Sequence, residues 1–122
     1  MKRFLAFAFL ALSVAPGGAR AAYQLPIRTN TAGELADLCA VDPRSPGADA
    51  KVNFCHGFAQ GAIAVELGHA GEKKPFCFPN PAPTRQETMS QFAAWVKSQP
   101  DRRSVPSTEG LFRFLGERFP CK

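Results

Sequence analysis

The chain has 122 residues, a formal net charge of +5 and four cysteines. Lys2, Arg3 and Arg20 lie in the first 21 residues, so the remaining 101 residues (122 − 21) carry a formal charge of only about +2 (5 − 3). This balance, without a basic patch interleaved with aromatic residues, argues against nucleic-acid binding. A chain of about 100 residues is expected to fold as one domain.

Residues 1–21 have the pattern of a signal peptide. Lys2 and Arg3 precede an apolar run over residues 4–14, and Ala19 and Ala21 supply the small residues of a cleavage site. The run is shorter than the roughly 20 residues that span a bilayer. We therefore expect cleavage after Ala21 and an exported, periplasmic domain over residues 22–122. The alternative is an uncleaved anchor at the membrane surface.

Residues 51–68, from Lys51 to Gly68, are predicted to form the central helix. Apolar residues cover most of its circumference, in one stripe of Val52, Cys55, Ala59, Ala62 and Ile63 and a second of Phe54, Phe58, Gly61 and Val65. A helix that is apolar nearly all round is expected to be buried. Glycines inside a helix are unfavourable relative to alanine, so Gly57 and Gly61 predict the close approach of a neighbouring backbone.

Two Thr-x-x-Glu patterns mark other helix starts. They run from Thr31 to Glu34 and from Thr84 to Glu87. In this capping box the Thr hydroxyl accepts from the backbone N–H three residues on, and the Glu side chain reaches back to the Thr N–H.

A last helix is expected between Pro106 and Pro120. No segment shows the period-two alternation of a strand. The sequence therefore predicts an all-α fold, a small disulfide-stapled bundle of about four helices around residues 51–68.

The cysteines are Cys39, Cys55, Cys77 and Cys121. Four cysteines in an exported chain indicate two disulfides. Up-and-down helix geometry places the first two at one end of the bundle and the last two at the other. It favours Cys39–Cys55 and Cys77–Cys121, although sequence alone leaves the other two pairings open.

Catalytic and metal-binding patterns are absent from the sequence. Cys55 and His56 are neighbours, so on a helix their side chains point about 100° apart and one cannot activate the other. His56 with Gln60 is better explained as a polar strip than as a base. His56 and His69 have no suitably spaced cysteines for a zinc site. We expect no enzyme activity, no cofactor and no metal.

Cysteines and aromatic residues recur in a set of short motifs. These are Leu38–Cys39, the core motif Cys55-x-Gly57-Phe58-x-x-Gly61, the Cys-Phe-Pro sequence at 77–79, the stretch from Trp95 to Arg103 and the Phe-Pro-Cys ending at 119–121. Together they resemble the Rap/Tai immunity proteins of type VI secretion. The resemblance extends from about Ala32 to Cys121, nearly all of the predicted mature chain.

The resemblance implies a periplasmic, all-α homodimer that blocks a peptidoglycan amidase delivered by a neighbouring cell, by inserting a protruding loop into its active site. The best candidate loop is residues 99–104, with Asp101, Arg102 and Arg103 expected to be exposed because of their charge. The alternative for these residues is an ordinary solvated connection. Trp95 is expected to be partly exposed, as aromatic residues at interfaces are.

A second function is compatible with the same sequence. Small exported helical proteins with disulfides also include periplasmic stress proteins and chaperones. A chaperone of that kind is expected to lose its dimer and expose its core at low pH, whereas an inhibitor is expected to stay folded and bind one partner.

Overall fold

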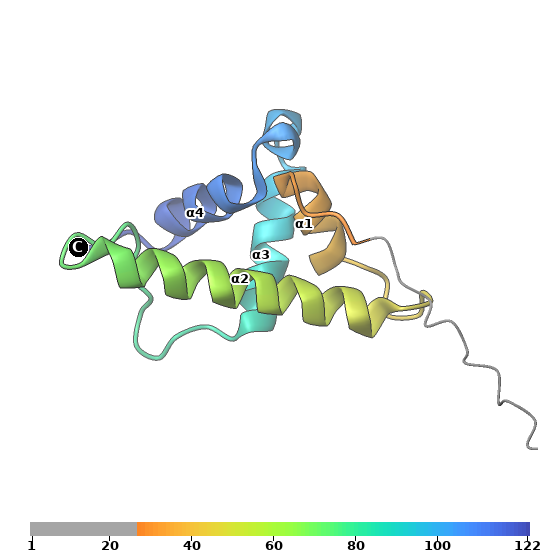
Figure 1. The fold of residues 1–122 in the computed structure, drawn as a ribbon, viewed down its shortest axis with the longest axis horizontal. Coiled ribbons are helices and arrows are strands. Elements are labelled where there is room, and N and C mark those ends of the chain that lie inside the picture. The colour runs from red at the N-terminus through yellow and green to blue at the C-terminus, as the bar shows by residue number, and fades with distance from the viewer. Residues whose placement is uncertain (1–26) are drawn as a thin grey trace, which may run out of the picture.

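The computed structural model describes residues 27–122, so the predicted signal peptide and its cleavage site lie outside the described residues. The elements are α1 (Ala32–Cys39), α2 (Ala48–Ala70), α3 (Arg85–Lys97), the short 3₁₀ helix η1 (Pro100–Ser104) and α4 (Ser107–Arg118) (Figure 1). Between residues 27 and 122 the only β-type pairing is one isolated bridge, Thr31 with Pro106. The predicted all-α, disulfide-stapled fold is confirmed.

Both predicted capping boxes are present. Thr31 caps α1 with Glu34, and Thr84 caps α3 with Glu87. In each box the Thr hydroxyl accepts from the Glu N–H at 3.2 Å, and the Glu carboxylate accepts from the Thr N–H. Each cap satisfies backbone groups that a helix start leaves unpaired, and it fixes where the helix begins.

The core lies among α1, α3 and α4. Its most deeply buried large side chains are Leu35, Val96, Phe92, Leu111 and Leu115 from these helices, with Phe76 from the connection between α2 and α3. Phe92 and Phe114 meet edge to face at a centroid distance of 5.7 Å, a favoured arrangement of aromatic pairs.

The two disulfides have the predicted pairing. Cys39–Cys55 joins the end of α1 to α2, and Cys77–Cys121 joins the α2–α3 connection to the C-terminus. The second crosslink is reinforced by a backbone hydrogen bond of 2.8 Å from the Cys77 N–H to the Phe119 carbonyl. The connection is thus fixed against α4, which seats Phe76 in the core.

The expectation that residues 51–68 are enclosed by other helices is wrong. The helix is longer than predicted, at 23 residues, but only Ala48, Cys55 and Ala59 are buried. At about 1.5 Å per residue it is roughly 34 Å long, whereas α1, α3 and α4 have 8, 13 and 12 residues. Helix α3 crosses α2 rather than running beside it (Figure 1). One side of α2 is therefore left uncovered.

The close approach predicted at Gly57 and Gly61 is also absent, since a Cβ at either position would meet nothing within 4 Å. Close contacts occur at two other glycines instead. A Cβ at Gly110 of α4 would lie 2.6 Å from the Cβ of Ala32, and one at Gly33 would lie 3.0 Å from the carbonyl oxygen of Arg103. These two glycines let α1 pack closely against α4 and η1.

None of the helices between residues 27 and 122 combines the length and the apolar character that crossing a bilayer requires.

Candidate protein-binding surfaces

The first candidate surface is the turn that contains Asp101, Arg102 and Arg103. It forms η1 between α3 and α4 and projects at the top of the molecule in Figure 1. No residue of η1 is buried. The turn is closed by a backbone hydrogen bond from the Arg102 N–H to the Gln99 carbonyl (3.1 Å). The Ser104 hydroxyl also donates to the carbonyl of Asp101 (3.1 Å).

Arg102 is not exposed as its charge suggested. Its side chain is only 19% exposed, and its guanidinium lies 3.9 Å from the centre of the Trp95 ring. Its Nη1 donates to the carbonyl of Trp95 at 2.7 Å and to the hydroxyl of Ser98 at 2.9 Å. Glu117 lies 3.8 Å away. Arg102 therefore holds the turn against α3 and α4.

Trp95 is engaged by its own chain. Its ring packs near Phe92 and Phe114, at centroid distances of 6.5 and 6.0 Å, and Arg102 lies over the ring. Its indole N–H donates to Glu117 at 2.6 Å. Trp95 is partly exposed, as predicted. Its ring and its N–H are nevertheless both used in contacts within the chain, so its exposure does not single it out as an interface residue.

Arg103 connects the turn to α1. Its two Nη atoms donate to the two carboxylate oxygens of Asp37 at 3.2 and 2.7 Å. This carboxylate raises the pKa of the Arg103 guanidinium, chiefly through the hydrogen bond. Gly33 leaves room for the arginine backbone and side chain to lie against α1. Of the three predicted residues, Asp101 is thus the one whose side chain makes no hydrogen bond or ion pair within residues 27–122.

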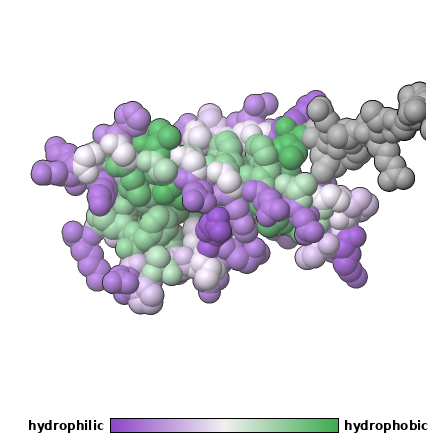
Figure 2. Space-filling model, turned by 60° about the horizontal axis from the view of Figure 1, so that its bottom comes forward, coloured by the Kyte–Doolittle hydropathy of each residue, from purple (hydrophilic) through white to green (hydrophobic). Residues whose placement is uncertain are grey.

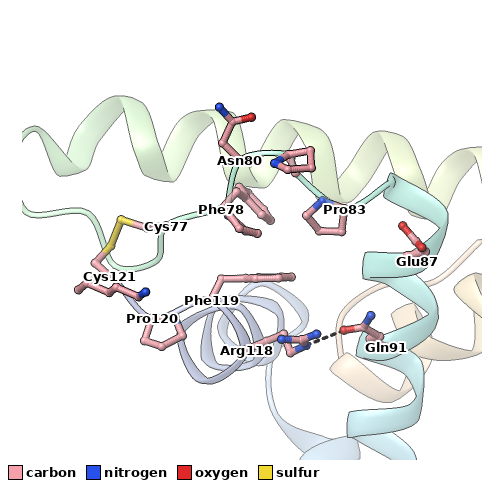
Figure 3. Close-up of a pocket in the computed structure, with 14 residues that line it drawn as sticks. Cys77, Phe78, Asn80, Pro83, Glu87, Gln91, Arg118, Phe119, Pro120 and Cys121 are labelled. Atoms are coloured by element: carbon pink, nitrogen blue, oxygen red, sulfur yellow. Dashed lines mark hydrogen bonds between the residues drawn. A yellow bond between two sulfur atoms is a disulfide. The ribbon is translucent and has the colours of Figure 1, made fainter.

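A second surface is the groove between the proline-rich connection and the C-terminus (Figure 3). It has a volume of about 980 Å³. Phe78 packs against Phe119 at 5.1 Å between centroids, and the Nε of Arg118 donates to Gln91 at 2.7 Å. Glu87 also borders the groove, but the N–H and hydroxyl of Thr84 donate to its carboxylate and hold its pKa below the ordinary value.

The third surface is the uncovered side of α2, which carries most of the core motif. Cys55 of this motif is fully buried in its disulfide. Gly57 and Gly61 are exposed, and the partly buried Phe58 stacks against Phe54 at 6.4 Å. Figure 2 shows apolar residues gathered along the side of the molecule that carries α2. Sequence reasoning missed this surface, although the second apolar stripe of α2 was its signal.

Groups suited to catalysis or metal binding do not come together in the described chain. Cys55 is oxidised, so its sulfur is not a nucleophile for His56 to activate. The carbonyl oxygen of the Gln60 side chain accepts from Arg85 at 2.9 Å, which ties α2 to the start of α3. No cluster of three or more His, Cys, Asp or Glu side chains suited to a metal ion occurs among residues 27–122.

These features define a small, disulfide-bonded helical domain that offers surfaces for a protein partner. The model of a family described as Rap1a immunity proteins matches residues 31–121. The match covers 91 of the 122 residues (121 − 31 + 1), and the chain belongs to this family. No curated protein and no solved structure is significantly similar to the chain.

Proposed function

We propose that this chain is an exported immunity protein that binds a peptidoglycan amidase effector of type VI secretion and occludes its active site, without catalytic activity of its own. The observation that carries the proposal is the family match over residues 31–121, which implies binding to a protein effector.

The turn η1 is the proposed blocking element. Arg102 fixes it to α3 and Arg103 fixes it to α1, so its conformation is set before any partner arrives. A preformed surface avoids the ordering cost that a flexible loop has on binding. In this arrangement Gln99, Pro100 and Asp101 form the surface presented to the effector, and the two arginines position it.

Export to the periplasm is the proposed location. The pattern of residues 1–21 supports it, as do the two disulfides, which persist in oxidising compartments. Peptidoglycan lies in the same compartment, so the inhibitor and the amidase would meet where the damage occurs. A homodimer is the proposed assembly.

A chaperone is the second candidate, and one observation favours it. The uncovered side of α2 presents apolar side chains, including Phe54 and Val65, as a surface for unfolded clients would. A chaperone would suppress aggregation of unrelated proteins, whereas an immunity protein would bind one effector stoichiometrically.

The test is capture of an effector by the exported, oxidised chain. Candidate amidases encoded beside its gene are each mixed with wild type, with Asp101→Arg and with Asp49→Arg as a control at an exposed aspartate of α2. We expect wild type and the control to retain one amidase and Asp101→Arg to lose at least tenfold in affinity. Equal capture by all three would exclude η1 as the contact, and suppression of unrelated aggregation without capture would favour the chaperone.

A further inference from the structure

A pocket of about 380 Å³ lies between α2, the start of α3 and the connection between these helices. The connection runs from the end of α2 back below this helix to α3 (Figure 1). Pockets for small molecules have volumes of about 300–1,000 Å³. Helix α2 contributes one face to the lining, with residues at spacings of three and four: His56, Ala59, Gln60 and Ile63. The pocket thus has the size and the setting of a small-molecule site.

The inner lining of this pocket is mainly apolar. Ala59 and Met89 are buried, and Phe78 is partly buried. The one buried polar side chain of the lining is Thr88, whose hydroxyl donates to the carbonyl of Thr84 at 2.9 Å. Its proton is therefore already used. A polar group that is buried without a hydrogen-bond partner is unfavourable, so the inner lining favours a ligand with an apolar body.

The exposed edge of the pocket carries a positive charge. Arg85, the first residue of α3, donates from Nη1 to the side-chain oxygen of Gln60 at 2.9 Å, so this bond joins two walls of the pocket. Among residues 27–122, no Asp or Glu lines the pocket and Arg85 forms no ion pair. A guanidinium has five N–H donors in a planar fork. The donors that Gln60 does not use suit a carboxylate, which arginine can bind at two points.

We propose that this pocket binds a small apolar monocarboxylate, with its hydrocarbon body against Ala59, Ile63 and Met89 and its carboxylate on Arg85. The occupant is a free acid rather than the C-terminal residue of a peptide. A peptide end would bring backbone N–H and C=O groups into the pocket, and these need partners when they are buried. The buried side chains of the lining offer no unused donor for them, whereas a hydrocarbon chain needs none.

The pocket is separate from the proposed effector-binding turn. It lies at the start of α3, whereas η1 follows the end of α3. The helix has 13 residues and is roughly 20 Å long. The inference therefore goes beyond the proposed function and does not depend on it. An acid in the pocket is not expected to compete with an effector at η1.

The first test titrates octanoate into the exported, oxidised chain and follows its backbone amide signals by NMR. We expect saturable shifts at Ala59, Ile63 and Met89, with half-saturation at or below about 1 mM. Acetate has the charge without the body, and octanol has the body without the charge. Each is expected to bind at least about tenfold more weakly than octanoate. Absence of saturable shifts at the lining residues with octanoate would overturn the proposal.

The second test separates the charge of Arg85 from its bond to α2. Arg85→Gln removes the charge and is expected to weaken octanoate binding about tenfold. Gln60→Ala removes the bond but keeps the charge, and Arg44→Gln removes an exposed charge outside the pocket. Both are expected to bind octanoate nearly as wild type does. Circular dichroism verifies that each variant is folded.

Each other outcome counts against the proposal. Unchanged affinity in folded Arg85→Gln, or octanol binding as tightly as octanoate, would overturn the carboxylate site. An equal loss in Gln60→Ala would show that the bond between the helices, and not the charge, controls the pocket. A peptide with a C-terminal leucine that binds in the pocket where octanoate does not would overturn the free acid and assign the pocket to the end of a partner chain.

Discussion

The guanidinium of Arg102 lies 3.9 Å from the centre of the Trp95 ring, and it donates a hydrogen bond of 2.7 Å to the Trp95 carbonyl. Arg102 thus contacts the ring of Trp95 and also hydrogen-bonds to its backbone. The contact fastens η1 to the end of α3, so a charged residue of the proposed binding turn is a structural residue.

Replacing Arg102 is therefore expected to destabilise the fold. Arg102→Ala removes the ring contact and two hydrogen bonds from a largely buried guanidinium, which we expect to cost about 2 kcal/mol. Arg102→Lys keeps the charge but not the planar geometry, so we expect a partial loss. Urea unfolding of the oxidised protein measures both, and unchanged midpoints would contradict the anchoring role.

Arg103 is expected to matter less. Its pair with Asp37 is well aligned, but both side chains are about half exposed, so solvent screens the interaction. Exposed pairs typically contribute less than about 1 kcal/mol. A double-mutant cycle of Arg103→Ala and Asp37→Ala isolates the pair. A coupling energy above about 2 kcal/mol would show that Arg103 is as important an anchor as Arg102.

Two alanine substitutions are expected to change stability in opposite directions. Gly110→Ala places a Cβ 2.6 Å from that of Ala32, so the helices must separate. Such overpacking typically costs about 1–3 kcal/mol. Gly61→Ala meets nothing within 4 Å and is expected to raise helix stability by up to about 1 kcal/mol. Denaturant unfolding at low protein concentration compares the two, and similar shifts would contradict the described packing.

The stability of the fold is expected to be nearly constant from pH 7 down to about pH 5. Hydrogen bonds from Thr84 lower the pKa of Glu87 from its ordinary value of 4.5. Because the folded pKa lies below the unfolded one, the stabilisation is complete above 4.5 and is lost as the pH falls through the folded value.

The matched variant for this pH prediction is Glu87→Gln, which retains a capping side chain but does not titrate. Its thermal midpoint is expected to fall less than that of wild type below pH 4.5. Both proteins are followed by circular dichroism. Unfolding of wild type at pH 5 would contradict this behaviour and favour the acid-activated chaperone.

The two disulfides are expected to contribute unequally. They close 16 and 44 residues, and the chain-entropy model gives about 3 and about 4 kcal/mol for loops of these lengths. Cys39 and Cys55 are also buried, so replacing them with serine places two hydroxyl groups in the core. We therefore expect the Cys39→Ser/Cys55→Ser double variant to be at least as destabilised as Cys77→Ser/Cys121→Ser. Urea unfolding tests the order.

The features predicted correctly from the sequence depend on local geometry. Thr31 and Thr84 each bond to a glutamate three residues on, so the capping boxes can be identified from spacing alone. The disulfide pairing followed from the order of the helices and the ends at which the cysteines lie. The first prediction needs only local spacing, and the second needs only the number and direction of the helices.

The errors concern contacts between distant elements. The apolar stripes of α2 do not reveal that its neighbours are too short to cover it, so Phe54 and Val65 were expected in the core. Likewise Arg102 and Arg103 belong to a charged run that looks solvated. Their partners Glu117 and Asp37 lie 15 and 66 residues away, and only the folded chain brings them together.

The most direct measurement of the central claim is amidase activity on purified peptidoglycan, titrated with the exported, oxidised protein. We predict that the activity of the captured amidase falls to zero at one binding site per enzyme, and that Asp101→Arg requires at least ten times more protein. An amidase that is bound but remains fully active at saturation would contradict occlusion of its active site by η1.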